Sequence, residues 1–584
     1  MSPSKPPSEL RQAVNGLRPY FVRAAWFSVF SSILILAPSG YMLEVYGRVV
    51  DSRSHITLLM LTILVIAAYV LMEVLDWARS EIMHEAGLAL DHKMSARVFQ
   101  VIFEANLRRM PGGTVQPMND FKTVREFLHS PVLLALMESP VSLVCMLLLF
   151  AISPVLGWAA VAGAIVQGLV GWANERNTQP QLMAANRTAI AAQQYADGSL
   201  RNAEVIESMG MLRDIHRRWV EKQREFLGLQ ALASERAGGY QALTKFIQTL
   251  MGSLLLGLGA WLLLHNELRG GAGMMVVGSI LGGRVLAPLV AIVTQWRTVV
   301  NFRDAWSRVD GLLTAVPARV PGMPLPPPRG VLQVEQLVAG APGSANAILR
   351  GVAFNLQPGE VLAVVGPSAS GKTTLARLLV GLWPAAAGKV RLDGADIFAW
   401  DKSELGPHIG YLPQGVELFD GTVAENIARF GPVEKTKVES AARAVGLHEF
   451  ILALPQGYDS PVGRDGAMLS GGQRQRMALA RALYGDPAYV VLDEPNSSLD
   501  EAGDAALAAA LLELKTRGTT FVVMTHRTSV LAVADKMLVL REGMQQAFGP
   551  RDEVLAALRK ASEQAAAQQA QPGLRHPGLA APRA

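Results

Sequence analysis

Residues 366–373 contain two glycines separated by four residues and followed at once by a lysine and a threonine. In full, the segment consists of Gly366, Pro367, Ser368, Ala369, Ser370, Gly371, Lys372 and Thr373. It fits the phosphate-binding pattern G-x-x-x-x-G-K-[ST] without a mismatch. The apolar run 361–365 before it predicts a buried parallel strand, and a helix containing Thr374 is expected after it. Backbone N–H groups and a helix N-terminus would then face the phosphates of a nucleotide, with Lys372 as an added charge.

An acidic pair and a histidine follow two further apolar runs. Asp493 and Glu494 come directly after 489–492, so we expect them at the end of a second strand. There Asp493 can hold Mg²⁺ through water, and Glu494 can orient or deprotonate an attacking water. His526 follows 522–525. Alone, an acidic pair is usually solvated and such a histidine usually structural, but after a phosphate loop both favour nucleotide hydrolysis.

The segment 469–474, Leu-Ser-Gly-Gly-Gln-Arg, resembles the signature of ATP-binding cassette (ABC) proteins. The resemblance implies a P-loop α/β cassette domain that binds ATP and Mg²⁺. It also implies that the signature docks on the nucleotide held by a second subunit, through Ser470, Gly471, Gly472 and Gln473. Gln414 resembles the loop residue that links metal and water to the membrane domain, and His526 resembles the switch histidine at the γ-phosphate. Asp500, in 497–500, resembles the loop that communicates between the two sites.

These assignments define a catalytic set and a metal set. The catalytic residues expected from the resemblance are Glu494, His526 and Gln414, and the expected metal ligands are Thr373, Gln414 and Asp493. Two positions depart from the family pattern. Segment 337–342 offers no aromatic residue to stack on adenine, so base recognition is less secure than phosphate binding. Arg464 lies where exporters often have an acidic residue, which puts the family's communication through that loop in doubt.

The composition indicates a membrane protein. Half of the 584 residues are hydrophobic and 18% are charged, whereas soluble proteins carry about a quarter charged residues. The net charge of +5 is mild and mixed with acidic residues, which argues against nucleic-acid binding. Apolar stretches of about the 20 residues that cross a bilayer predict six membrane helices. They fall at about 22–45, 56–76, 132–152, 155–173, 243–264 and 272–293.

The spacing of these stretches suggests a domain plan. The polar intervals 77–130 and 174–242 have helical apolar spacing, so they are expected to extend membrane helices into the cytoplasm. An even number of spans places both termini on one side, and ATP binding requires that side to be the cytoplasm, although Arg48 and Arg53 in an outer loop oppose the positive-inside rule. We expect an N-terminal segment 1–20, a membrane domain 21–315, a Pro-rich linker 316–330, a cassette domain 331–560 and a disordered tail 561–584.

A membrane domain followed by a cassette in one chain resembles the six-helix ABC exporters. Segments 41–46, 51–54 and 418–427 resemble more closely the bacterial type I protein-secretion exporters that lack an N-terminal peptidase domain. The resemblance implies a homodimer in the bacterial inner membrane that secretes a polypeptide. It also implies two partners, a periplasmic membrane-fusion adaptor and an outer-membrane channel.

Several alternatives remain open from the sequence. An exporter of lipids or drug-like molecules shares every cassette motif. A soluble ATPase of DNA maintenance or translation is disfavoured by the six spans, and a non-transporting membrane regulator by intact Glu494 and His526. Two polar residues within the spans are ambiguous. Arg284 could line a translocation path or be paired, and Glu138, beside Ser139 and Pro140, could mark a broken helix or line the path.

Overall fold

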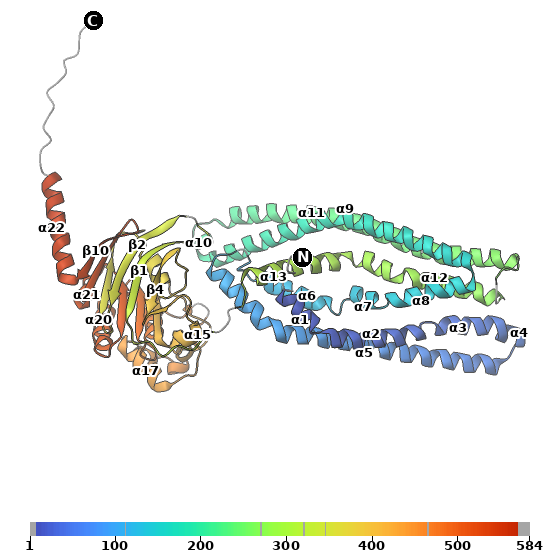
Figure 1. Cartoon of the computed structure of the whole chain (residues 1–584), viewed down its shortest axis with the longest axis horizontal. Coiled ribbons are helices and arrows are strands. Elements are labelled where there is room, and N and C mark those ends of the chain that lie inside the picture. Colours follow the sequence, from blue (N-terminus) through green and yellow to red (C-terminus); the bar gives the residue numbers. More distant parts are fainter. Residues whose placement is uncertain are drawn as a thin grey trace, which may run out of the picture. The chain divides into compact units, whose positions relative to one another are not determined.

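The structure is a computed structural model that describes residues 8–110, 112–268, 271–318, 322–344, 346–463 and 466–569. It divides into two compact units, a membrane unit up to Pro317 and a cassette unit from Ala318, with 107–110 grouped with the cassette (Figure 1). The boundary falls inside the predicted linker 316–330. Arg464 and residues 570–584 of the predicted tail lie outside the described residues.

The membrane unit is entirely helical in its described part. Its elements are α1 (Glu9–Asn15), α2 (Arg18–Leu34), α3 (Ala37–Glu44), η1 (Val45–Val49), α4 (Val50–Ser52), α5 (His55–Leu107), α6 (Gln116–Phe127), α7 (Pro131–Met137), α8 (Ser139–Ile152), α9 (Pro154–Arg201), α10 (Ala203–Ser208), α11 (Leu212–Leu264), α12 (Gly271–Thr294) and α13 (Trp296–Ala315). Six helical stretches in the described residues are long and apolar enough to span a membrane, which confirms the predicted number: Arg18–Ser52, His55–Leu107, Gln116–Ile152, Pro154–Arg201, Leu212–Leu264 and Gly273–Thr294.

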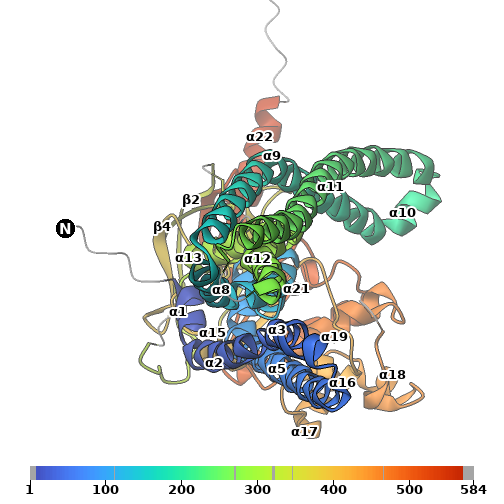
Figure 2. The ribbon, with the colours of Figure 1, turned by 90° about the vertical axis from the view of Figure 1, so that its right-hand side faces the viewer.

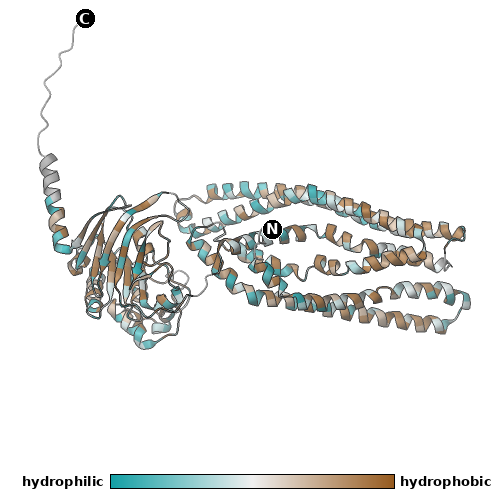
Figure 3. Cartoon of the chain, in the orientation of Figure 1, coloured by the Kyte–Doolittle hydropathy of each residue, from teal (hydrophilic) through white to brown (hydrophobic). Residues whose placement is uncertain are grey.

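Three of these helices are much longer than a bilayer is thick. Both α5 and α11 have 53 residues, which corresponds to about 80 Å against a hydrocarbon core of about 30 Å. Apolar residues gather toward one end of the membrane unit and polar residues toward the other (Figure 3). Helices α9 and α11 run side by side (Figure 2). The predicted helical extensions of the membrane spans are therefore confirmed.

The first and third spans are interrupted, and proline accompanies both breaks. Pro38 and Pro140 lie in the first turns of α3 and α8, where a missing N–H costs no helical hydrogen bond. At the second break, Glu138 caps α7 and accepts a hydrogen bond from Arg79 of α5 at 2.8 Å. Glu138, which the sequence left open as a pathway residue, is therefore an ion-pair partner at a broken helix.

The cassette unit is built on two sheets. A four-stranded sheet has the order β2-β1-β4-β5, and a six-stranded sheet has the order β10-β9-β3-β8-β7-β6. The strands are β1 (Leu332–Gly340), β2 (Ala347–Leu356), β3 (Val361–Val365), β4 (Ala387–Leu392), β5 (Ala395–Asp396), β6 (Ile409–Leu412), β7 (Tyr489–Asp493), β8 (Thr520–Met524), β9 (Lys536–Arg541) and β10 (Met544–Pro550). Strands β3, β6, β7 and β8 are short, apolar and mutually parallel, as predicted for the runs 361–365 and 489–492.

Helices pack on these sheets around two clusters of buried apolar side chains. The described helices are α14 (Lys372–Leu379), α15 (Lys402–Leu405), η2 (Gly406–His408), α16 (Val423–Ile427), α17 (Lys435–Ala444), α18 (His448–Leu452), η3 (Gly457–Asp459), α19 (Gly471–Leu483), α20 (Glu501–Thr516), α21 (Thr528–Val533) and α22 (Arg551–Gln569). Helix α22 continues to Gln569, so residues 561–569 of the predicted disordered tail are helical. Their alanine- and glutamine-rich composition favours a helix.

Candidate active site

The motifs separated in sequence meet at one edge of the six-stranded sheet. Strands β3, β8, β7 and β6 are neighbours and run parallel, so their carboxyl ends lie on the same edge. The phosphate loop follows β3, His526 follows β8, and Gln414 follows β6. Asp493 ends β7 and Glu494 comes next. This edge is where ligands bind in open α/β sheets.

The phosphate loop depends on glycine at two positions. A Cβ on Gly366 would lie 2.2 Å from the carbonyl oxygen of Leu540, so β9 leaves no room for a side chain. Gly371, immediately before α14, has φ +100°, a region that favours glycine. Strand β3, the loop and α14 thus form the predicted strand–loop–helix unit, with Thr373 and Thr374 in the first turn of α14.

Lys372 connects the phosphate loop to the end of β8. Its Nζ donates to the carbonyl oxygens of Gly366 and Pro367 at 2.6 and 3.2 Å, and lies 2.9 Å from Nε2 of His526. An ammonium group has no acceptor, so Nε2 must be the acceptor and the imidazole proton lies on Nδ1. Burial lowers the pKa of Lys372, while the carboxylates of Glu494 and Asp493 oppose this effect. The predicted lysine and switch histidine are therefore in direct contact.

The acidic pair has two different environments. Asp493 is 1% exposed, and neither carboxylate oxygen accepts a hydrogen bond of good geometry from a described residue. Burial raises its pKa; the nearby Thr373 hydroxyl lowers it, whereas Glu494 adds to the rise. Glu494 has φ +53°, which is uncommon for a residue other than glycine, and its Oε2 accepts a hydrogen bond from Nε2 of Gln414 at 3.0 Å. The structure thus brings Gln414 and Glu494 together at the end of the sheet.

The signature residues form a helix start. Ser470 is the N-cap of α19, and its side chain and that of Gln473 bond to each other's backbone N–H groups in a capping box. Asp500 similarly caps α20 by accepting from the N–H of Gly503. Among the described residues, no hydrogen bond joins Ser470, Gln473 or Asp500 to the phosphate loop. Within one protomer the signature and the phosphate loop are thus separate parts.

Gln475 is a site residue that sequence reasoning missed. From α19 its Nε2 donates to the carbonyl oxygens of Glu494 and Pro495, at 3.1 and 2.6 Å. Its Oε1 accepts from the N–H of Ser498 and the hydroxyl of Ser497. The side chain is 3% exposed, so these bonds form in a protected environment. Gln475 couples the signature helix to the loop that begins at Glu494. One signal in the sequence could have identified Gln475: it is a polar residue on the face of α19 that is otherwise apolar and buried.

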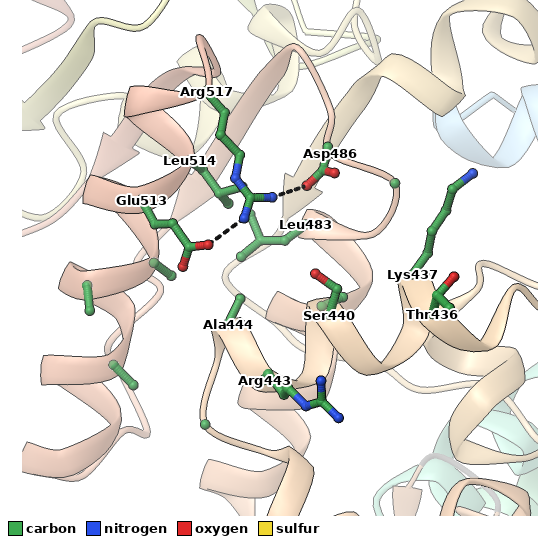
Figure 4. Close-up of a pocket in the computed structure, with 16 residues that line it drawn as sticks. Thr436, Lys437, Ser440, Arg443, Ala444, Leu483, Asp486, Glu513, Leu514 and Arg517 are labelled. Carbon is green, nitrogen blue, oxygen red and sulfur yellow. Dashed lines mark hydrogen bonds and ion pairs between the residues drawn. The ribbon is translucent and has the colours of Figure 1, made fainter.

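A cleft of about 620 Å³ elsewhere in the cassette unit is not part of this site. It lies between α17, α20 and the end of α19 (Figure 4). Arg517 on its wall pairs with Asp486 at 3.3 Å and also with Glu513. None of the residues predicted to bind nucleotide lines it. The candidate active site therefore rests on the side chains at the sheet edge and not on the size of a cavity.

Comparisons with known proteins agree with this arrangement. The ABC transporter family pattern matches residues 349–497, and that of the ABC transporter transmembrane region matches 23–283. The type I secretion system ATP-binding protein PrsD of Rhizobium meliloti is 39% identical over 545 residues, 93% of each chain. The chain belongs to the ABC transporters of type I protein secretion. As a member of this family, it is an ATP hydrolase coupled to transport.

A further relative and a solved structure are also similar to this type I secretion transporter. The toxin RTX-I translocation ATP-binding protein of Actinobacillus pleuropneumoniae is 27% identical over 93% of this chain and 77% of that protein. A bacterial Atm1-family ABC exporter with ATP bound has 24% identity and a TM-score of 0.80 over 96% of this chain and 99% of that chain. The last likeness shows the ABC exporter fold: six membrane helices and an α/β cassette.

Proposed function

We propose that this transporter exports a polypeptide across the bacterial inner membrane as the permease and ATPase of a type I secretion system. The observation that carries the proposal is the cluster of Lys372, His526, Gln414 and Glu494 at one sheet edge, in a chain with six membrane spans. The relatives named for type I secretion and toxin translocation favour a polypeptide over a lipid or drug-like molecule. The cassette lies on the cytoplasmic side, where ATP is available.

Each residue at the sheet edge has a proposed role in ATP hydrolysis. The loop from Gly366 to Thr374 cradles the phosphates, with Lys372 as the point charge near the γ-phosphate. His526, already 2.9 Å from Lys372, contacts the same phosphate. Glu494 accepts a proton from the attacking water, whose oxygen bonds to the γ-phosphorus as the bond to ADP breaks. Gln414 holds the Glu494 carboxylate and the water in position.

The buried carboxylate of Asp493 fits a Mg²⁺ site. Both of its oxygens are buried without a hydrogen-bond donor of good geometry among the described residues, and an unpaired buried carboxylate is costly. A divalent cation held by Asp493, Thr373 and Gln414, together with the substrate phosphates, would satisfy these oxygens. When bound, the ion would neutralise charge on the phosphates.

Two protomers complete the proposed machine. Ser470, Gly471, Gly472 and Gln473 present the start of α19, and we propose that they close on the nucleotide held by the partner subunit. Asp500 would then lie at the boundary between the two subunits. All proposed catalytic residues occur in this one chain, so a homodimer has two competent sites. The adaptor and outer-membrane channel of type I secretion are the proposed partners for passage beyond the inner membrane.

Replacement of Glu494 by glutamine tests the hydrolysis part of the proposal. The amide keeps the size of the side chain but cannot accept the water proton, so turnover should fall by about 10² or more. Binding of ATP should remain, because the phosphate loop is unchanged. ATP hydrolysis and nucleotide binding are measured on the purified protein in lipid nanodiscs.

Glu513→Gln is the matched control, because Glu513 is an exposed carboxylate in the same cassette that pairs with Arg517. Its turnover should equal that of the wild type. Undiminished hydrolysis by Glu494→Gln would refute the assigned role.

A further inference from the structure

Arg284 lies near the middle of a membrane span. It belongs to α12, within the apolar stretch Gly273–Thr294. It is 13 residues after Gly271, the first residue of α12, or about 20 Å along the helix. A charge at such a depth costs at least about 2.5 kcal/mol if it faces hydrocarbon. The groups around the Arg284 guanidinium must therefore compensate its charge, and they indicate the function of this residue.

The protomer itself does not neutralise Arg284. Its side chain is exposed, whereas Leu281, Val285 and Leu286 of the same helix are buried in the helix core. Throughout the residues that the structure describes, the guanidinium makes no hydrogen bond and no ion pair. Gly283 beside it is also open, since a Cβ built there meets no atom within 4 Å. The surface of α12 is therefore unobstructed at Arg284 and at the neighbouring Gly283.

Two acidic residues of the membrane unit, Glu138 and Glu44, already have cationic partners. Glu138 pairs with Arg79 at 2.8 Å, and Glu44 lies 3.6 Å from Arg48. Because no described carboxylate pairs with Arg284, two environments could solvate the guanidinium at this depth: a water-filled passage, or a carboxylate supplied from outside the protomer. Contact with lipid chains is disfavoured by its cost of at least about 2.5 kcal/mol.

We propose that Arg284 lines the conduit and binds carboxylates of the polypeptide as it passes, an inference that rests on the proposed export function. The planar guanidinium matches a carboxylate through two parallel hydrogen bonds. Two copies, one from each protomer, would face the same passage and favour acidic segments and the C-terminal carboxylate. The open backbone at Gly283 allows an extended chain to approach the helix there.

Thiol labelling tests whether position 284 faces water. Cys145 is the only cysteine and is buried, so Cys145→Ser provides a cysteine-free background. In that background, Arg284→Cys is compared with Val285→Cys, which replaces a neighbour that is 5% exposed. The reagent is the charged, water-soluble trimethylammonium-ethyl methanethiosulfonate, applied to protein in nanodiscs. It reacts with a thiolate to form a mixed disulfide and releases methanesulfinate.

We expect the cysteine at 284 to react at least about tenfold faster than the one at 285, because thiolates form in water and not in hydrocarbon or a packed core. Equal, slow reaction at both positions overturns the inference, since it places Arg284 against lipid or sealed against the partner subunit.

Charge selectivity tests the ligand. Two fluorescent peptides of equal length, one rich in glutamate and the other with glutamine at the same positions, are titrated with protein in nanodiscs. The preference is the ratio of the two dissociation constants, glutamine peptide over glutamate peptide. This ratio should be about ten times larger for the wild type than for Arg284→Gln, as expected for loss of a charged hydrogen-bonding partner. Arg284→Lys should keep part of the preference, because it keeps the positive charge. An unchanged preference in Arg284→Gln rejects carboxylate binding.

These readouts do not depend on transport. If the cysteine at position 284 reacts slowly but the wild-type protein secretes a polypeptide, only the inference about Arg284 is rejected. If the cysteine at position 284 reacts fast but the wild-type protein secretes nothing, the proposed export function is rejected instead.

Discussion

Lys372 and His526 are 154 residues apart in sequence, and their side-chain nitrogens are 2.9 Å apart. The contact exists because β3 and β8 are parallel neighbours whose carboxyl ends meet. Buried lysine is costly, and here carbonyl oxygens of the phosphate loop and the imidazole solvate the ammonium. The residues that would bind phosphate therefore already form a hydrogen-bonded group in the protein alone.

Arg429 is a second residue whose contacts are made by segments distant in sequence, so that only the folded structure reveals them. It follows α16 and donates to five backbone carbonyl oxygens, two before and within β6 and three around the end of α19. Each of these bonds is between 2.8 and 3.3 Å. Burial lowers the pKa of its guanidinium. Arg429 thereby ties α16 to the strand that leads to Gln414.

Arg429→Ala should destabilise the cassette strongly. It leaves several partly buried carbonyl groups without a donor, at about 1–3 kcal/mol for the site as a whole after water enters. The thermal unfolding midpoint of the cassette transition should fall by several degrees. Arg443→Ala is the control, because Arg443 is exposed and pairs with Glu439 one helical turn away; its midpoint should change little. Equal midpoints for both variants would contradict this account.

At the scale of elements, the break between α7 and α8 is held by charge. Arg79 of α5 is 5% exposed and pairs with Glu138 at the break and with Asp76 on its own helix. Ser28 of α2 also accepts from Arg79, and Ser31 of α2 donates to Asp76. This network joins three spans where a proline prevents a continuous helix. A broken helix in a membrane needs such partners for its free polar groups.

Loss of Arg79 should loosen this junction. Arg79→Met leaves Glu138 and Asp76 unpaired, and we expect a loss of about 2–3 kcal/mol, less than for a fully buried pair because Glu138 is partly exposed. The measurement is the thermal stability of the purified protein and its yield in detergent. The double variant Arg79→Met with Glu138→Gln should regain part of the lost stability, because it has one unpaired charge fewer than Arg79→Met. Arg48→Ala, which breaks an exposed pair with Glu44, is expected to have little effect. Additive losses in the double variant would show that the two residues do not interact.

At the scale of the whole molecule, ATP hydrolysis and secretion must depend on the same chain. Deletion of the gene should remove at least one polypeptide from the culture medium, and the wild-type gene should restore it. Glu494→Gln should not restore it, although the protein is made and inserted, because the conduit needs turnover. The proteins of the medium are compared by mass spectrometry, with Glu513→Gln as the positive control. A medium that is unchanged by deletion would contradict the export function.

Much of this architecture could be predicted from local sequence. Six apolar stretches match bilayer thickness, and long amphipathic intervals continue as α5, α9 and α11, because hydropathy and helical periodicity act over neighbouring residues. The phosphate loop was predicted for the same reason, since glycine spacing specifies its backbone. The extent of α22 was missed, because a polar, alanine-rich helix has no apolar periodicity to reveal it.

Side-chain partners across the fold could not be predicted. Gln475 reads as one more polar residue after the signature, and Glu138 as a charge beside a proline; their functions depend on Glu494, Ser498 and Arg79, far away in sequence. Sequence alone determined that this protein has a nucleotide-binding cassette and six spans, since both are written in local spacing and hydropathy. Tertiary structure alone decided which charges are paired and which, like Arg284, are left open, because strand order and helix packing choose the neighbours of each side chain.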